Sequence, residues 1–256
     1  MAEKFKTLAF CLKEDNIGEA DKSFVLYTEK FGKIKLIGKG IRKINSKLRQ
    51  SIKFFSLLRI EFVEGKYFKK LTGAEVIKEY KEIKNDLTKL KIAYFFADVL
   101  DNLEKEENRE IKIWNLLCDF FRELNYCTPG ENENKKKEKN TKQGLSCLEV
   151  YLYFLIHLIS LLGYLPNLIT CSNCHRKFSS FAYFLLEKKE FVCQRCFLKE
   201  KGEKFCKVSI KVLETIKKLF NSSLKEFKNL KFEKSLLLEV AKFLKFYLLF
   251  LEKSQL

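Results

Sequence analysis

The chain has 256 residues, 46% of them hydrophobic, which is enough for one large domain or for two to three small ones. Its formal net charge of +17 favours a polyanionic partner, such as nucleic acid, or an anionic membrane surface. The longest apolar stretch, residues 151–165, contains His157 and Gly163 and is shorter than the ~18 residues of a membrane span. We therefore expect a buried helix there and no membrane segment.

Residues 1–80 have the pattern of short strands separated by turns. Apolar and polar residues alternate at 6–12, 23–28, 33–36, 52–63 and 67–74, the two-residue period of a strand. Turn residues lie between them, including Asp15–Gly18 and Glu64–Lys66. Five short strands with little room for a helix predict a closed five-stranded barrel of the OB type, which commonly binds single-stranded nucleic acid.

The connection between the third and fourth predicted strands is strongly basic. Residues 38–49, here called the basic loop, carry five cations and no acid. A basic loop at the rim of a barrel can follow a phosphate backbone, although a solvated loop is the alternative interpretation. We predict DNA contacts from these loop cations, with two outer candidates on the flanking segments: Lys39, Arg42, Lys43, Lys47 and Arg49, then Lys35 and Lys53.

From about residue 79 the apolar period becomes helical, which predicts a helical domain over residues 81–256. Asp86 can cap the first helix. The expected buried stripes are Leu87, Leu90, Tyr94 and Ala97; Trp114, Leu117, Phe121 and Leu124; Leu148, Leu152, Leu155, Ile159 and Leu162; Val212, Ile216 and Leu219; and Leu237, Val240, Leu244, Tyr247 and Leu251. The fold class is therefore α+β with more than one domain.

Two cysteine pairs interrupt the helical pattern. Cys171 and Cys174 have two residues between them, as do Cys193 and Cys196, and eighteen residues separate the pairs. This spacing is typical of a structural Zn²⁺ site, in which two tight turns supply four thiolates and leave no open position. We predict one zinc per chain in a small lobe at residues 168–200 that includes a hairpin. His175 could replace one thiolate, but it breaks the symmetry of the two turns.

The order of barrel, basic loop, helices, cysteine lobe and final helices resembles the RecO family of bacterial recombination mediators over essentially the whole chain. The segments most similar to that family are Gly18–Ser23, Phe31–Ile34, Gly38–Lys43, Phe55–Leu58 and Leu161–Pro166. The resemblance implies a non-catalytic, cytoplasmic and nucleoid-associated DNA-repair protein. Such a protein binds single- and double-stranded DNA and anneals complementary strands. It also works with RecR and single-strand-binding protein to load recombinase.

Two other function classes stay open at this stage. One is a zinc-ribbon RNA-binding module, and the other is a metal-dependent enzyme that acts on nucleic acid. Against the enzyme, no Asp, Glu and His residues cluster at ligand spacing, and the only histidines are His157 and His175. The glycines around Lys39 do not form a phosphate-binding P-loop, because five residues separate Gly32 from Gly38 where the motif has four.

Overall fold

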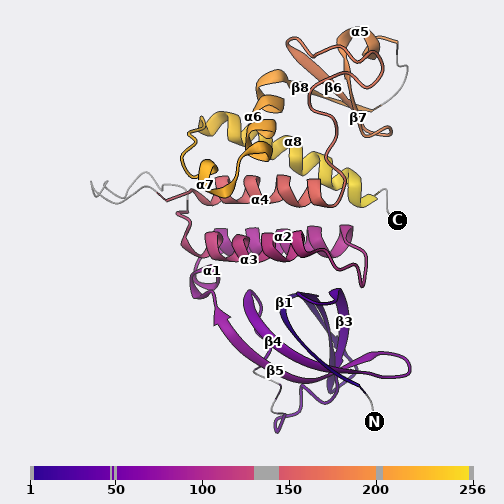
Figure 1. Ribbon diagram of the computed structural model, residues 1–256, viewed down its shortest axis with the longest axis vertical. Coiled ribbons are helices and arrows are strands. Elements are labelled where there is room, and N and C mark those ends of the chain that lie inside the picture. Colours follow the sequence, from indigo (N-terminus) through magenta and orange to yellow (C-terminus); the bar gives the residue numbers. More distant parts are fainter. Residues whose placement is uncertain (1–2, 47, 49–50, 130–143, 200–203, 254–256) are drawn as a thin grey trace, which may run out of the picture. The chain divides into compact units, whose positions relative to one another are not determined.

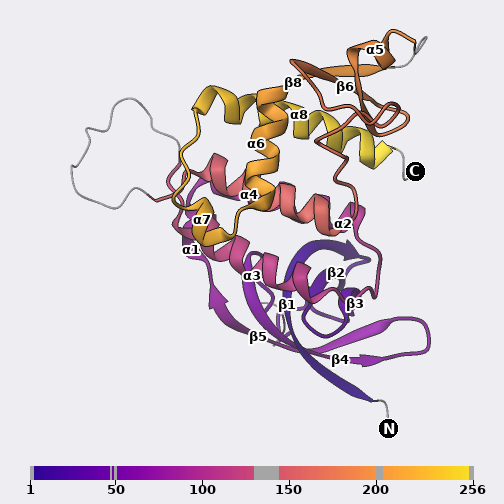
Figure 2. The same cartoon turned by 45° about the horizontal axis from the view of Figure 1, so that its top comes forward.

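The computed structural model describes residues 3–46, 48, 51–129, 144–199 and 204–253. These residues form a mixed α+β structure that divides into two compact units, residues 1–141 and 142–256 (Figures 1 and 2). The first unit contains a five-stranded sheet and three helices, and the second contains five helices and a three-stranded sheet. None of the helices in the described ranges has both the length and the apolar character needed to cross a membrane.

The sheet of the first unit closes on itself in the order β1-β2-β3-β5-β4. Its strands are β1 (Lys4–Ile17), β2 (Asp21–Thr28), β3 (Gly32–Gly38), β4 (Ser56–Glu64) and β5 (Lys69–Glu79). Neighbouring strands are antiparallel except β3 and β5, which pair in parallel at Leu36–Lys69 and Ile37–Lys70. A closed five-stranded sheet fits the OB-type barrel that the alternating pattern predicts.

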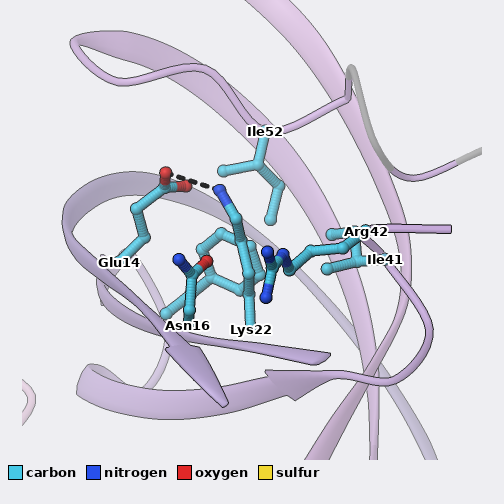
Figure 3. Close-up of a pocket in the computed structure, with 7 residues that line it drawn as sticks. Glu14, Asn16, Lys22, Ile41, Arg42 and Ile52 are labelled. Atoms are coloured by element: carbon cyan, nitrogen blue, oxygen red, sulfur yellow. Dashed lines mark hydrogen bonds and ion pairs between the residues drawn. The ribbon is translucent and has the colours of Figure 1, made fainter. Parts of the chain in front are cut away.

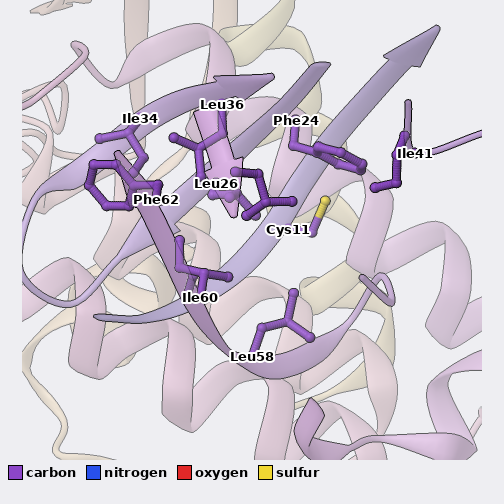
Figure 4. Close-up of a cluster of buried hydrophobic side chains, with 11 residues drawn as sticks. Cys11, Phe24, Leu26, Ile34, Leu36, Ile41, Leu58, Ile60 and Phe62 are labelled. Atoms are coloured by element: carbon purple, nitrogen blue, oxygen red, sulfur yellow. The ribbon is translucent and has the colours of Figure 1, made fainter. Parts of the chain in front are cut away.

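The interior of this barrel is filled by apolar side chains from every strand (Figure 4). Each strand contributes alternate residues to the interior, because successive side chains point to opposite faces of a sheet. The fully or almost fully buried set is Ala9, Cys11, Phe24, Leu26, Ile34, Leu36, Ile41, Leu58, Ile60, Phe62 and Leu71. Only Ile41 in this set lies outside a strand, because it belongs to the basic loop.

Three helices complete the first unit: α1 (Lys81–Asn85), α2 (Leu87–Leu103) and α3 (Ile111–Tyr126). Phe10 of β1 joins them to the barrel, because its ring stacks on Phe121 with 4.7 Å between centroids and lies 5.5 Å from Trp114. The ammonium of Lys33 is buried and donates to the backbone carbonyl of Asp101 on α2. Both contacts cover residues of the barrel that would otherwise face solvent.

The second unit is built from helices and a small sheet. Its helices are α4 (Cys147–Leu161), α5 (Gln194–Phe197), α6 (Ile210–Asn221), α7 (Leu224–Phe227) and α8 (Lys234–Lys253). Its strands are β6 (Phe181–Leu185), β7 (Glu190–Cys193) and β8 (Phe205–Ser209), in the order β7-β6-β8. Ser146 and Glu149 form a capping box at the start of α4, which fixes where that apolar helix begins.

The small sheet packs on α8 through aromatic side chains. Phe184 of β6 lies 5.1 Å from Tyr247 and 5.7 Å from Phe243, in edge-to-face arrangements. Phe191 of β7 lies 5.6 Å from Phe243. Such contacts between rings add about 0.5–1.5 kcal/mol each beyond the burial of area. The cysteine-containing lobe is therefore anchored on the last helix of its own unit.

The predicted elements are largely confirmed, with differences at their ends and in one helix face. The prediction of the first turn at Asp15–Gly18 is wrong in position, because β1 continues to Ile17 and the chain turns at Gly18–Ala20. Strand β4 begins at Ser56 instead of residue 52, and β8 was not predicted. The expected stripe of α2 is wrong in phase. Of its four residues only Ala97 is buried, and the helix instead buries Ala93, Phe96, Val99 and Leu100.

Two glycines with positive φ give a matched test of how the first unit packs. A Cβ at Gly32 (φ +64°) would lie 2.1 Å from the backbone oxygen of Asn108, whereas a Cβ at Gly18 (φ +52°) would meet nothing within 4 Å. We expect Gly18→Ala to cost roughly 1–2 kcal/mol of backbone strain. Gly32→Ala should cost at least about 3 kcal/mol, because overlap with the loop before α3 adds to that strain.

The measurement is urea unfolding followed by the fluorescence of Trp114, the only tryptophan, which is buried in this unit. Equal losses of unfolding free energy in the two variants would show that the segment at Asn108 does not pack closely against Gly32 of β3.

Candidate nucleic-acid interface and metal centre

The first half of the basic loop is fixed to the barrel. Ile41 is 3% exposed and packs in the barrel interior. The backbone N–H of Gly40 donates to Oδ1 of Asp21 at 2.7 Å, and the backbone N–H of Arg42 donates to the carbonyl of Ala20 at 2.9 Å. This segment is thus held by one buried side chain and by two backbone hydrogen bonds, one to Ala20 of the β1–β2 turn and one to Asp21 at the start of β2.

The structure brings together several of the predicted DNA-contacting cations. Lys39, Arg42 and Lys43 are all exposed around the buried Ile41. Lys35 is exposed on β3, and Lys53 lies just before β4 and is partly exposed. The two remaining candidates, Lys47 and Arg49, lie outside the described residues.

Two of these cations are paired with acids that lie far away in the sequence. Lys39 Nζ lies 2.8 Å from Oδ2 of Asp21, and Lys53 Nζ lies 3.3 Å from Oε1 of Glu79. Hydrogen bonds from Lys39 and from the Gly40 N–H lower the pKa of Asp21, so that this carboxylate stays charged at neutral pH. The basic loop has no acid of its own, but Asp21 at the start of β2 supplies one to Lys39. Glu79 at the end of β5 pairs with Lys53, which follows the loop. Sequence reasoning missed both acids.

A cavity of about 390 Å³ opens beside the basic loop (Figure 3). The polar residues that line it are Arg42, Lys22, Glu14 and Asn16, and the apolar ones are Phe24, Ile41 and Ile52. Lys22 is ion-paired to Glu14 at 2.7 Å, whereas the Arg42 guanidinium donates to the carbonyl of Gly18 at 3.0 Å. The partner of the Arg42 guanidinium is a neutral backbone oxygen, so this contact does not offset its positive charge with a carboxylate. The cavity could therefore accept an anionic or polar group on its Arg42 side.

The second unit gathers the four cysteines of the predicted metal site. The sulfurs of Cys171, Cys174, Cys193 and Cys196 all lie within 4.8 Å of one another. The sulfurs of Cys174 and Cys193, one from each pair, lie 3.7 Å apart. A tetrahedral Zn²⁺ with Zn–S bonds of ~2.3 Å separates its sulfurs by about 3.8 Å, so the arrangement is compatible with a four-thiolate metal site.

Backbone hydrogen bonds hold the two cysteine turns together. The N–H of His175 donates to the carbonyl of Cys171 at 2.8 Å, which closes the first turn. The N–H of Ser172 donates to the carbonyl of Phe191 at 3.0 Å, which ties that turn to the strand ending at Cys193. Cys196 follows on the single turn of α5. The fourfold arrangement is therefore built by local folding of the lobe.

The cysteine thiols differ in how readily they ionise. Burial opposes ionisation of Cys171, but backbone N–H groups of Cys193, Cys174 and Asn173 outweigh it and lower its pKa to about 7. Burial and the three neighbouring sulfurs raise the pKa of Cys196 to about 12. Four thiolates this close repel one another unless a cation lies between them, and a bound metal ion removes that conflict.

His175 is exposed and is not part of the metal-binding group found among the described residues. Its φ of +57° is a left-handed conformation, which the backbone adopts as it leaves the first cysteine turn. The four cysteines form the ligand set that the geometry favours.

Comparison with known proteins gives a consistent relationship along most of the chain. A family model described as "Recombination protein O N terminal" matches residues 1–80, and one described as "Recombination protein O C terminal" matches residues 141–251. The first match ends with the barrel and the second includes the cysteine lobe.

Several curated proteins are similar over most of their length, and each carries the name "DNA repair protein RecO". The protein of Dehalococcoides mccartyi is 29% identical over 213 residues, which cover 83% of this chain and 78% of the relative. That of Caldanaerobacter subterraneus is 27% identical, covering 78% and 74%. That of Symbiobacterium thermophilum is 22% identical, covering 91% and 87%. Because both family models match the chain in order, and because these relatives align over most of their length, the chain belongs to the RecO family.

Proposed function

We propose that the chain is a non-catalytic DNA-repair protein that binds single- and double-stranded DNA and anneals complementary strands. In this proposal it acts with RecR and single-strand-binding protein to load recombinase, in the cytoplasm at the nucleoid. The observation that carries the proposal is a cluster of exposed cations, Lys39, Arg42 and Lys43, held in a fixed loop of the barrel in a member of the RecO family.

The chemistry of the loop suits contact with the DNA backbone. Lysine and arginine side chains bind phosphate oxygens and read no base edges, so binding should tolerate any sequence. Annealing then requires that the repulsion between two strands be reduced while the bases stay free to pair. Lys47 and Arg49, next along the sequence, would extend the contact, and Lys35 and Lys53 would flank it.

We further propose that the four cysteines bind one structural Zn²⁺. All-sulfur tetrahedral sites favour zinc or iron, and a closed four-thiolate zinc site stabilises a fold without doing chemistry. The zinc lobe and the basic loop belong to different units, so metal binding and DNA contact should be separable.

The central test reverses the charge of two loop residues. In a variant carrying Arg42→Glu and Lys43→Glu, affinity for single-stranded DNA should fall at least roughly tenfold near 50 mM salt, because two phosphate contacts become repulsive. The slope of log affinity against log salt should become shallower by about 1.4–1.8, which is the release of two counterions. Annealing of complementary oligonucleotides without nucleotide triphosphate should fall in parallel.

The matched control carries Lys91→Glu and Lys112→Glu, two exposed lysines on α2 and α3, and has the same net charge. Equal loss of affinity in both variants would mean that net charge and not the basic loop governs binding. A nuclease assay on the unmodified protein tests the enzyme alternative, because strand cleavage would overturn the non-catalytic assignment.

Asp21→Asn should raise the affinity of the basic loop for DNA, where the charge reversal lowers it. Asparagine still accepts the hydrogen bond from Gly40, but it no longer neutralises Lys39. Affinity for DNA should rise by roughly fivefold at low salt, because the positive charge of Lys39 is then no longer offset by a neighbouring carboxylate. Filter binding or fluorescence anisotropy measures the change. The control is Asp98→Asn, on the exposed side of α2. An equal gain of DNA affinity in that variant would show that Lys39 does not contact the DNA.

Metal analysis of the purified full chain should give one zinc per chain. Cys196→Ser should lose the metal and unfold the lobe, because metal binding and folding of such a lobe share one free energy. Cys206→Ser, on β8 of the same three-stranded sheet but outside the cysteine cluster, should keep the metal. Iron in place of zinc, or full metal content in Cys196→Ser, would contradict the proposed site.

A further inference from the structure

The turn between β4 and β5 carries two exposed aromatic rings. This hairpin tip, residues 65–68, projects from the barrel (Figures 1 and 2). Tyr67 is 82% exposed and Phe68 is 39% exposed. The tip is a built turn, because the N–H of Gly65 donates to the carbonyl of Phe68 at 3.1 Å, and a Cβ at Gly65 would lie 2.8 Å from that oxygen.

The ring of Tyr67 is not explained by packing within the barrel. The ammonium of its neighbour Lys66 lies over the ring, 5.3 Å from the centroid. The other ring, Phe68, has the ammonium of Lys39 at 5.3 Å from its centroid. Because Lys39 begins the exposed part of the basic loop, the hairpin tip and the basic loop form one continuous surface.

The two rings border a cavity of about 510 Å³ whose charges nearly balance. Its lining includes three lysines, Lys35, Lys66 and Lys69, and three acids, Glu64, Glu106 and Glu107. Lys69 is paired with Glu107 and, at 3.5 Å, with Glu64. Within the described residues, no ion pair involves Lys35 or Lys66. A cavity with this balance suits a flat, uncharged group better than a phosphate.

We propose that Tyr67 and Phe68 form a stacking platform for an unpaired nucleobase, while the adjoining basic loop holds the phosphates on either side. This inference rests on the proposed DNA binding and adds a site to it. Aromatic side chains accept any base by its face, so the platform tolerates every sequence. A duplex hides the faces of its bases in its own stack, so the platform distinguishes single strands from double strands, which the lysines cannot do.

The test compares single-stranded and duplex oligonucleotides of equal length and mixed sequence, bound to the full chain at low salt. Tyr67→Ala should weaken single-strand binding by about 5- to 150-fold, the range for loss of one stacked base, and change duplex binding less than about twofold. Tyr67→Phe should bind as the unmodified protein does, because the ring is kept. Tyr126→Ala is the control, since Tyr126 is 71% exposed on α3 of the same unit.

A second readout uses Tyr67→Trp, whose indole fluorescence should be quenched by single strands and not by duplex. Trp114 is 5% exposed and contributes a constant background. Unchanged single-strand affinity in Tyr67→Ala, or equal loss for both forms of DNA, overturns the platform and leaves the proposed function standing. If the unmodified protein binds neither form, the proposed function and the platform fail together.

Discussion

The burial of Ile41 in the barrel interior is the contact on which the arrangement of the candidate DNA-binding surface depends. A closed barrel has one apolar interior, and this side chain fills part of it from outside the strands. Burying an isoleucine contributes about 1.5–3 kcal/mol, which is enough to fix the segment around it. The residues beside it, Gly40 and Arg42, then bond the β1–β2 turn through their backbone, and Lys39, Arg42 and Lys43 are left exposed. A loop of cations becomes a fixed surface through one apolar residue.

The sequence predicted the parts of the fold that depend on local pattern. The alternation in residues 1–80 identified five strands, and the helical stripes of α3, α6 and α8 are buried as expected. Asp86 caps α2 by accepting from the N–H of Lys89. The spacing of the four cysteines identified the group that the structure brings within 4.8 Å. The strand, helix and cap signals lie within a few residues, and each cysteine pair has two residues between its members, so local patterns were enough.

The side-chain pairings and the helix face that the sequence missed depend on partners distant in the chain. Lys33 has the place of an outward-facing strand residue, yet α2 buries it and its ammonium bonds Asp101. The face of α2 that is buried is set by the surfaces that the helix covers, and the stripe of large apolar residues in its sequence does not determine that face. Asp21 and Glu79 reach Lys39 and Lys53 because of strand order and register, which a single sequence does not reveal. Pairing of charges is therefore a property of the topology here.

Charge and stacking would respond differently to the conditions in which a repair protein works. Phosphate contacts weaken as salt rises, because releasing counterions into a more concentrated salt solution gains less entropy. Stacking of a base on an aromatic ring involves no net charge and is not screened in this way. A surface that combines the basic loop with Tyr67 and Phe68 would therefore lose duplex binding first as salt rises. Its preference for single strands would then be greater at physiological ionic strength than at low salt.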